Sequence, residues 1–275
     1  DKFRRFAKNR AALVSLFFIL ILLSVSFIAP LMMPYGYSDA FAGKELIAFS
    51  WQHPFGTDEL GRDQLVRIMY AVQNAVIVAV ASVLLALFFG AVIGSLSGYW
   101  GGLFDQVMMR FVDIFTALPQ LLVMILLLAV MPDHIDRRIS IFIAIGVTSW
   151  AGYARLIRGQ VLQAKQEEYV EAARALGAKP SHILRKYILP NIAGPIIVSV
   201  GFGIPTAMMA ESGMSLLGLG LEAPMPSWGN LIYSGSMFMF DSPYLVFWPA
   251  FTFALTLLAF TFISDGLGGL YGKEK

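Results

Sequence analysis

Long apolar segments separated by short polar stretches run the length of this 275-residue chain. The segments 11–33 and 71–97 carry no charged residue and exceed the roughly 20 apolar residues that a helix needs to cross a bilayer. Four weaker candidates follow, at about 103–130, 139–154, 191–221 and 242–264. The pattern predicts six transmembrane helices, and an even number of crossings places both ends of the chain on the same side.

Charged residues mark the third and fourth of these segments. Asp105, Arg110 and Asp113 occupy the first half of 103–130, where ionisable groups are costly unless they are paired. We interpret them as a ladder at the membrane interface, because Arg110 and Asp113 are three residues apart on one helix face. The fourth segment is short and ends before Arg155.

The fifth segment combines a carboxylate with several helix breakers. Gly194-Pro195 and the stretch 201–205 are expected to interrupt the helix, and interrupted helices are tolerated at membrane depth where they line a cavity. This segment is therefore the predicted wall of a transport pathway, with Glu211 as its candidate ligand for an ammonium group or a cationic side chain. Alternatively, Glu211 holds a structural hydrogen bond. The pathway candidates are Glu211, Met208 and Ser212.

Composition supports an all-α, polytopic membrane protein. Hydrophobic residues make up 57% of the chain and charged residues only 14%, whereas soluble domains carry about 25% charged residues. The chain has no cysteine, which excludes disulfides, thiolate metal sites and cysteine nucleophiles. We expect no cleavable signal peptide, although the chain begins at Asp1 without a methionine.

The distribution of positive charge predicts the orientation. With both termini in the cytoplasm, 15 of the 20 Lys and Arg residues face that side, as the positive-inside rule requires. Asp265 then marks the cytoplasmic end of the last helix. The residues assigned to the cytoplasmic side are Lys2, Arg4, Arg5, Lys8, Arg10, Arg110, Arg155, Arg158, Lys165, Arg174, Lys179, Arg185, Lys186, Lys273 and Lys275.

Small residues repeat at a spacing of four along the second segment, at Ala86, Gly90, Gly94 and Gly98. This spacing lines one helix face and lets two backbones approach closely in lipid. The stripe predicts close helix packing inside this chain, with contact between subunits as the alternative.

A charged stretch on the predicted cytoplasmic side, "EYVEAARALGAKPSHILRKYILPN" at 168–191, stands out from its apolar surroundings. Glu168 and Glu171 suit the start of a short helix, and Gly177 suits the left-handed residue that ends it. Pro180 suits the first turn of a second helix. The stretch therefore predicts a bent pair of helices outside the bilayer, with Ala172 and Ala173 giving a low, smooth face.

The same stretch resembles the EAA signature of permease subunits in bacterial ATP-binding-cassette importers. Glu171, Ala172, Ala173 and Gly177 match its first part, and "ILP" at 188–190 matches its end. Other segments resemble the dipeptide, oligopeptide and nickel permeases of the DppC/OppC type. These are "HPFGTDELGRDQLVRIMYA" at 53–71, "GYWGGLFDQVMMRFVDIFTALPQLL" at 98–122, "AESGMSLLGLGLEAPMPSWGNLI" at 210–232 and "ISDGL" at 263–267.

This resemblance implies a MetI-like type I importer fold in a bacterial or archaeal cytoplasmic membrane. It implies an N-terminal region at 1–70, with the first helix and an extracytoplasmic loop, and a permease core at 71–275 with a coupling loop at about 158–190. In such importers the loop docks on an ATPase subunit. The coupling residues implied here are Glu171, Ala172, Ala173, Gly177, Tyr169, Arg174 and Leu176.

The chain contains no G-x-x-x-x-G-K-[ST] loop, so we expect it to bind no cofactor and to leave ATP and Mg²⁺ to partner subunits. The resemblance implies two ATPase subunits, a second homologous permease in a heterodimer, and an extracytoplasmic solute-binding protein. We expect no metal site, because His53, His134 and His182 are scattered over both sides of the membrane. No nucleic-acid partner is expected.

One charged turn lies on the predicted outer side, at Asp58, Gly61, Arg62 and Asp63. We interpret it as a structural lock between the loop and the following helix, with contact to the binding protein as the alternative.

The leading interpretation is a transport subunit for di- or oligopeptides that catalyses no reaction itself. The same importer class with a nickel chelate or an oligosaccharide as substrate is the nearest alternative. An ion-coupled secondary transporter is a further one, but such proteins commonly carry internal repeats, and none is evident here. An intramembrane enzyme would need a second ionisable group beside Glu211 at the same depth.

Overall fold

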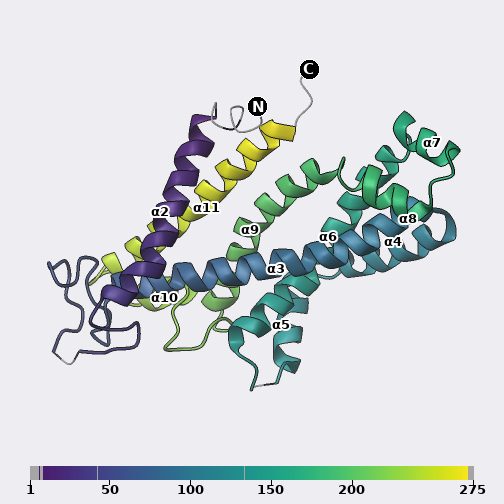
Figure 1. The fold of residues 1–275 in the computed structure, drawn as a ribbon. Helices are drawn as coiled ribbons and strands as arrows, with labels where there is room; N and C mark the ends of the chain where they lie inside the picture. The colour runs from purple at the N-terminus through teal and green to yellow at the C-terminus, as the bar shows by residue number, and fades with distance from the viewer. Residues whose placement is uncertain (1–5, 7–8, 42, 133, 272–275) are drawn as a thin grey trace.

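The computed structural model describes residues 6, 9–41, 43–132 and 134–271, and it is entirely helical apart from one isolated bridge at Thr57 and Asp63 (Figure 1). The positive charges predicted at Lys2, Arg4, Arg5, Lys8, Lys273 and Lys275 lie outside these residues. The elements in chain order are α2 (Arg10–Met32), α3 (Gln64–Trp100), α4 (Gly102–Ala117), α5 (Gln120–Val130), α6 (Arg137–Ala164), α7 (Glu168–Ala175), α8 (Pro180–Ile183), the π-helix η1 (Leu184–Ile188), α9 (Ala193–Leu216), α10 (Trp228–Ser236) and α11 (Tyr244–Tyr271).

Five of the described helices, α2, α3, α6, α9 and α11, are long and apolar enough to cross a membrane. The third predicted segment differs, because it is not one helix: α4 and α5 meet at an angle of 88°, as in a broken span or a re-entrant loop. The break falls at Leu118 and Pro119, where proline cannot continue the hydrogen-bond ladder and disfavours helical backbone at the preceding residue. We call residues 116–120 the elbow.

The fourth and sixth segments are longer than predicted. Helix α6 continues ten residues past 154, so Arg155 lies inside the helix, and α11 continues past Asp265 to Tyr271. Hydropathy alone ends a segment at its first charge, whereas a helix continues wherever its charges are paired or reach water.

The predicted interruption of the fifth segment was wrong, because α9 is one continuous helix with Pro205 inside it. Its glycines serve packing instead. A Cβ on Gly201 would lie 2.5 Å from Ser264 Oγ of α11, and a Cβ on Gly203 would lie 2.1 Å from the Tyr153 hydroxyl oxygen of α6. These two glycines let α9 fit between its neighbours.

The glycine stripe of α3 packs against α6 within this chain. A Cβ on Gly90 would lie 2.5 Å from Tyr153 Cβ, and one on Gly94 would lie 2.4 Å from the Ala154 carbonyl oxygen. A Cβ on Gly98 would lie 2.9 Å from the Arg158 carbonyl oxygen. The prediction of close packing inside the chain is confirmed, and the two backbones meet along three helical turns.

The helices divide the molecule into two ends (Figure 1). The start of α2, the end of α11 and the helices α7 and α8 lie toward one end, which we call the loop end. The segment before α3, helix α10 and the α5–α6 connection lie toward the opposite end. This arrangement agrees with an even number of crossings.

Replacing Gly94 with alanine should destabilise the protein by about 1–3 kcal/mol, because the added methyl group meets a backbone oxygen that cannot rotate away. The thermal unfolding midpoint of the purified protein in detergent would measure the change. Gly159→Ala is the matched control, since Gly159 lies in α6 and its added Cβ meets nothing within 4 Å. Equal midpoints for the two variants would contradict the proposed seam.

Candidate functional site

The charged stretch forms the predicted helix pair, with a well-defined turn between its halves. Gly177 adopts a φ of +78°, its N–H donates to the Arg174 carbonyl at 3.0 Å, and the Ala178 N–H donates to the Ala173 carbonyl at 3.1 Å. These two bonds form a Schellman motif, which ends a helix at a left-handed residue. Pro180 occupies the first turn of α8. The prediction of a helix end at Gly177 and a restart at Pro180 is confirmed.

The inner side of this helix pair is a small hydrophobic core. Val170, Ile183 and Ile188 are almost fully buried against Ile157 and Val161 of α6. Because the core includes the end of α6, the helix pair is packed onto that helix and is not a loose loop.

One predicted surface residue belongs to this core. Ala173 is only 6% exposed and packs inward, so the expected smooth face of Ala172 and Ala173 was half wrong. The two alanines are adjacent on a helix and point about 100° apart, which places only Ala172 on the outer face.

The outer face carries the remaining predicted coupling residues. Leu176 projects from the tip of the helix pair with 89% of its surface exposed, which is unusual for a leucine. Tyr169 is 38% exposed, and burial followed by the charge of Glu167 raises the pKa of Tyr169 above its ordinary value. Its hydroxyl therefore stays protonated and can donate a hydrogen bond. The exposed predicted residues are Tyr169, Glu171, Ala172, Arg174, Leu176 and Gly177.

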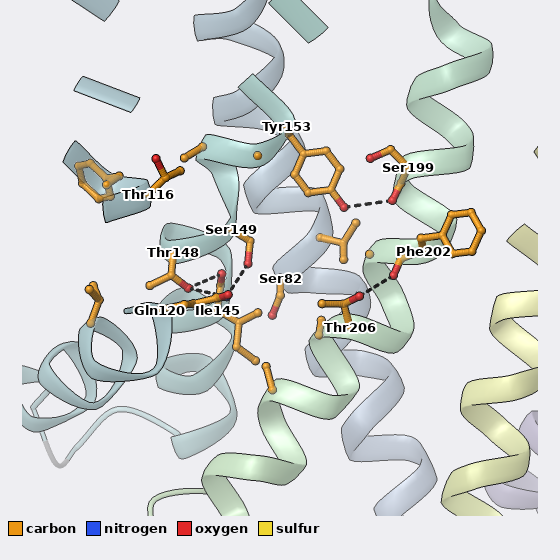
Figure 2. A pocket seen from close by; sticks show the side chains of 18 of the residues that line it. Ser82, Thr116, Gln120, Ile145, Thr148, Ser149, Tyr153, Ser199, Phe202 and Thr206 are labelled. Atoms are coloured by element: carbon orange, nitrogen blue, oxygen red, sulfur yellow. Dashed lines mark hydrogen bonds between the residues drawn. The ribbon is translucent and has the colours of Figure 1, made fainter. Parts of the chain in front are cut away.

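A cavity of about 560 Å³ lies between α3, the elbow, α6 and α9 (Figure 2). Its polar lining consists of neutral groups, namely hydroxyls, one amide and backbone, and none of its lining residues is ionised at neutral pH. The polar side chains that line it are Ser82, Thr116, Gln120, Thr148, Ser149, Tyr153, Ser199 and Thr206.

Two sets of hydrogen bonds connect the walls of this cavity (Figure 2). The Gln120 amide nitrogen lies 3.3 Å from the Thr148 hydroxyl and 3.2 Å from the Ser149 hydroxyl, which joins the elbow to α6. The Tyr153 hydroxyl donates to the Ser199 carbonyl at 3.4 Å, which joins α6 to α9. Polar contacts thus connect the helices that line the cavity.

Helix α9 lines the cavity, but not through the residues predicted for it. Glu211, Met208 and Ser212 are buried and do not belong to the lining. The Glu211 carboxylate accepts hydrogen bonds from the Ser215 hydroxyl at 2.8 Å and from the Ser212 hydroxyl at 3.2 Å. The structural alternative for Glu211 therefore describes its contacts in this structure.

Sequence reasoning missed the hydroxyl residues that line the cavity. A search for ionisable groups passes over serine and threonine, which satisfy their own helix when no partner is near. Thr148 and Thr206 do so here by donating to carbonyls one turn earlier. The adjacent Thr148 and Ser149 in an apolar segment were the available signal.

The aspartates of α4 form ion pairs with arginines of α6 and not with Arg110 of their own helix. Arg158 binds Asp105 through two bonds of 2.5 Å, and the Ser97 hydroxyl donates to the same carboxylate. Arg155 donates to Asp113 at 3.0 Å, so the predicted ladder between Arg110 and Asp113 was wrong. Partners 42 and 53 residues apart in sequence satisfy these charges better than neighbours on one helix.

Arg155 and Lys165 extend these contacts. The Arg155 guanidinium also donates to the Thr116 hydroxyl at 3.1 Å, which places it at the edge of the cavity. The Lys165 ammonium donates to the Tyr99 carbonyl at 2.5 Å. Together with the Asp105 pair, these bonds attach α6 to the end of α3 and to α4.

The charged turn before α3 is a structural lock, as interpreted from the sequence. The Arg62 side chain binds Asp58 at 2.7 Å and both are buried, while Gly61 has a φ of +73°. Asp63 caps α3 by accepting from the Val66 N–H at 2.9 Å, and it binds the His53 ring at 2.7 Å.

Two further bonds join this turn to α11. The Gln64 amide donates to the Leu245 carbonyl at 3.2 Å, and the Tyr244 hydroxyl donates to the Thr57 carbonyl at 3.0 Å. Within the described part of the chain, no three His, Asp or Glu side chains gather closely enough to hold a metal ion.

Two family profiles match the chain. Residues 90–274 match the family described as "Binding-protein-dependent transport system inner membrane component", and residues 1–48 match "N-terminal TM domain of oligopeptide transport permease C". The chain is 40% identical over 267 residues to the oligopeptide transport system permease protein OppC of Bacillus subtilis, covering 97% of this chain and 87% of the relative. It is also 40% identical over 268 residues to the dipeptide transport system permease protein DppC of the same organism, covering 97% and 83%.

Solved structures share the fold at lower identity. An inward-facing MetNI methionine ABC transporter has a TM-score of 0.57 at 19% identity, covering 76% of this chain and 97% of that one. An amino acid ABC transporter has a TM-score of 0.53 at 17% identity, covering 72% and 92%. These likenesses show a MetI-like arrangement of helices.

The Asp105–Arg158 pair should contribute more to stability than the Asp113–Arg155 pair, because its side chains are only 12% and 29% exposed, against 54% and 52%. In double-mutant cycles with Asp→Asn and Arg→Gln, we expect a coupling of about 1.5–3 kcal/mol for the first pair. The second pair, which serves as the control, should give at most about 1 kcal/mol. Thermal midpoints of the four variants in each cycle measure the coupling, and equal couplings would contradict the difference.

Proposed function

The chain belongs to the family of binding-protein-dependent transport system inner membrane components, and from this premise we propose that it forms a membrane pathway for di- or oligopeptides. It is a permease subunit of an ATP-binding-cassette importer and not an enzyme, as are the relatives that match it over nearly its full length. It is a multi-pass protein of a bacterial inner membrane.

The neutral, polar cavity is the observation that best supports a peptide substrate. A peptide main chain presents N–H and C=O groups whatever its sequence, and hydroxyl and amide side chains can both donate to and accept from such groups. A charged lining would favour one class of peptide side chain over another. The names of the relatives, which serve oligopeptide and dipeptide transport systems, point the same way.

The outer face of α7 and the tip at Leu176 are the proposed contact with an ATPase subunit. This face combines an exposed leucine with the charges of Glu171 and Arg174, which suits a partly apolar docking groove with a polar rim. The chain itself has no phosphate-binding loop, so ATP and Mg²⁺ belong to the partner. Ala173 serves the coupling indirectly, by seating α7 on α6.

The transport cycle then follows from the connections of the helix pair. It receives the chain from α6 and returns it to α9, and both helices line the cavity. When the ATPase subunits close, they displace α7, and α6 and α9 rock with it. The cavity thereby switches between outward and inward access, while the seam between α3 and α6 keeps its register.

The proposal also includes the partner subunits, the orientation in the membrane and the division of the chain. A second homologous permease forms the other half of the pathway, two ATPase subunits bind the two coupling loops, and a solute-binding protein delivers substrate at the outer end. The loop end faces the cytoplasm, as the charge distribution indicates. The region 1–70 precedes a permease core at 71–275.

Reconstitution of the complete transporter in liposomes tests the function. We expect uptake of a labelled peptide that requires ATP, Mg²⁺ and the binding protein, and mass spectrometry of the co-purified binding protein should find peptides. Uptake that continues without nucleotide under an ion gradient would instead indicate a secondary transporter. A nickel chelate or an oligosaccharide in the binding protein would reject the peptide and retain the importer.

Leu176→Asp should reduce ATP-dependent uptake more than about tenfold, because it places a charge at the centre of the proposed contact. The exposed site makes a folding defect unexpected. Gln163→Asp, on an exposed position of α6 outside this face, should leave uptake unchanged. ATP hydrolysis that binding protein still stimulates in Leu176→Asp would argue against the docking role.

Gly177→Val should also reduce ATP-dependent uptake, because it distorts the turn between α7 and α8. A β-branched residue is strained at a φ of +78°, so the Schellman motif that orients Leu176 is lost. The variant should insert into membranes and retain basal ATP hydrolysis in the complex while losing uptake. Normal uptake in Gly177→Val would show that the turn does not set the coupling geometry.

A further inference from the structure

One side chain bridges two helices at the end of the cavity that faces the coupling helices. Tyr153 is the cavity-lining residue of α6 nearest to the end of that helix, and Ser199 is the lining residue of α9 nearest to its beginning. The coupling helices connect the end of α6 to the beginning of α9. The bond between Tyr153 and Ser199 therefore lies across the cavity at its loop end. Figure 2 shows the two residues together at one end of the cavity.

The ring of Tyr153 occupies a slot formed by two glycines. Gly90 of α3 approaches its Cβ on one side, and Gly203 of α9 approaches its hydroxyl on the other. An added Cβ would lie 2.5 Å from Tyr153 Cβ in the first case and 2.1 Å from the hydroxyl oxygen in the second. The ring is 8% exposed, so it fills the space between three helices.

The bond itself is suited to break and form again. At 3.4 Å it is long for an O–H···O hydrogen bond, and its acceptor is a carbonyl inside α9 that already belongs to the ladder of that helix. If the ring withdraws, the carbonyl keeps its helical partner and the hydroxyl can turn to water in the cavity. Within the described residues, no other side-chain hydrogen bond joins α6 to α9.

We propose that Tyr153 is the gate at the loop end of the cavity, bound to α9 in this structure and released when α6 and α9 separate. The proposal rests on the proposed function, because the rocking of α6 and α9 described there is the movement that would separate the two helices. Tyr153 is thus a positioning residue for transport, and the lack of a side chain at Gly203 leaves room for the Tyr153 hydroxyl to reach α9.

The absence of cysteine from the chain gives a direct test. Ala210 lines the cavity on α9, eleven residues beyond Ser199, so Ala210→Cys introduces a single reporter thiol. The complete transporter is prepared in nucleotide-free membrane vesicles that expose the loop end, with Gln163→Cys, at an exposed position outside the proposed ATPase contact, as the marker of that orientation. A membrane-impermeant maleimide is added, and labelling of this chain is followed with time.

With Tyr153 in place, labelling of the reporter should be slow. Tyr153→Phe should accelerate it about fivefold, the factor expected for one neutral hydrogen bond, and Tyr153→Ala about tenfold or more. Gly203→Ala should also accelerate it, because the added methyl group displaces the ring. Gly213→Ala on the same helix, whose added Cβ meets nothing within 4 Å, should not.

Fast labelling with Tyr153 intact would overturn the gate, as would unchanged rates in both Tyr153→Phe and Gly203→Ala. If Tyr153→Ala fails to assemble, Tyr153→Phe and Gly203→Ala still test the gate. The assay needs no transport, so its result is separate from that of the proposed function. Loss of ATP-dependent peptide uptake in the unmodified transporter would count against the function alone, and unchanged labelling against the gate alone.

Discussion

The close contact between α3 and α6 is the constraint on which the other features depend. Gly90, Gly94 and Gly98 bring the two backbones together, and side chains at these positions would push α6 away. Because lipid offers apolar groups as good a solvent as the protein interior, such packing must come from fit and not from hydrophobic burial. The middle of α6 lines the cavity and its end carries the helix pair α7 and α8, so this seam sets the position of both.

Polar bonds also hold α6 in place against its neighbours. The guanidinium groups of Arg155 and Arg158 and the ammonium group of Lys165 all lie on α6, and they bind α4, the elbow and the end of α3. Charges near the membrane are costly unless they are paired, and here the partners lie on α4 and α3 and not on α6 itself. Helix α6 therefore connects the wall of the cavity to the helix pair α7 and α8, which we propose to contact the ATPase subunit.

Local features of this arrangement could be predicted from the sequence, whereas contacts between residues far apart in the chain could not. Gly177 and Pro180 determine the turn between α7 and α8 by their own backbone preferences, and the glycine spacing in α3 identifies a contact face. The partners of Asp105 and Asp113 depend on how helices far apart in the chain pack, which no local pattern contains. Leu118 and Pro119 did carry a signal for the elbow, but average hydropathy across the segment concealed it.

The lock in front of α3 has a consequence for the direction of movement. Gln64 and Tyr244 fasten the beginnings of α3 and α11 to each other and to the turn at Thr57, all at the end of the molecule opposite the coupling helices. Helices that are tied at one end can only fan apart at the other. The lock therefore fixes one end of α3 and α11, and α6 follows α3 through the glycine seam. In the proposed cycle, a displacement applied at α7 acts far from this fixed end.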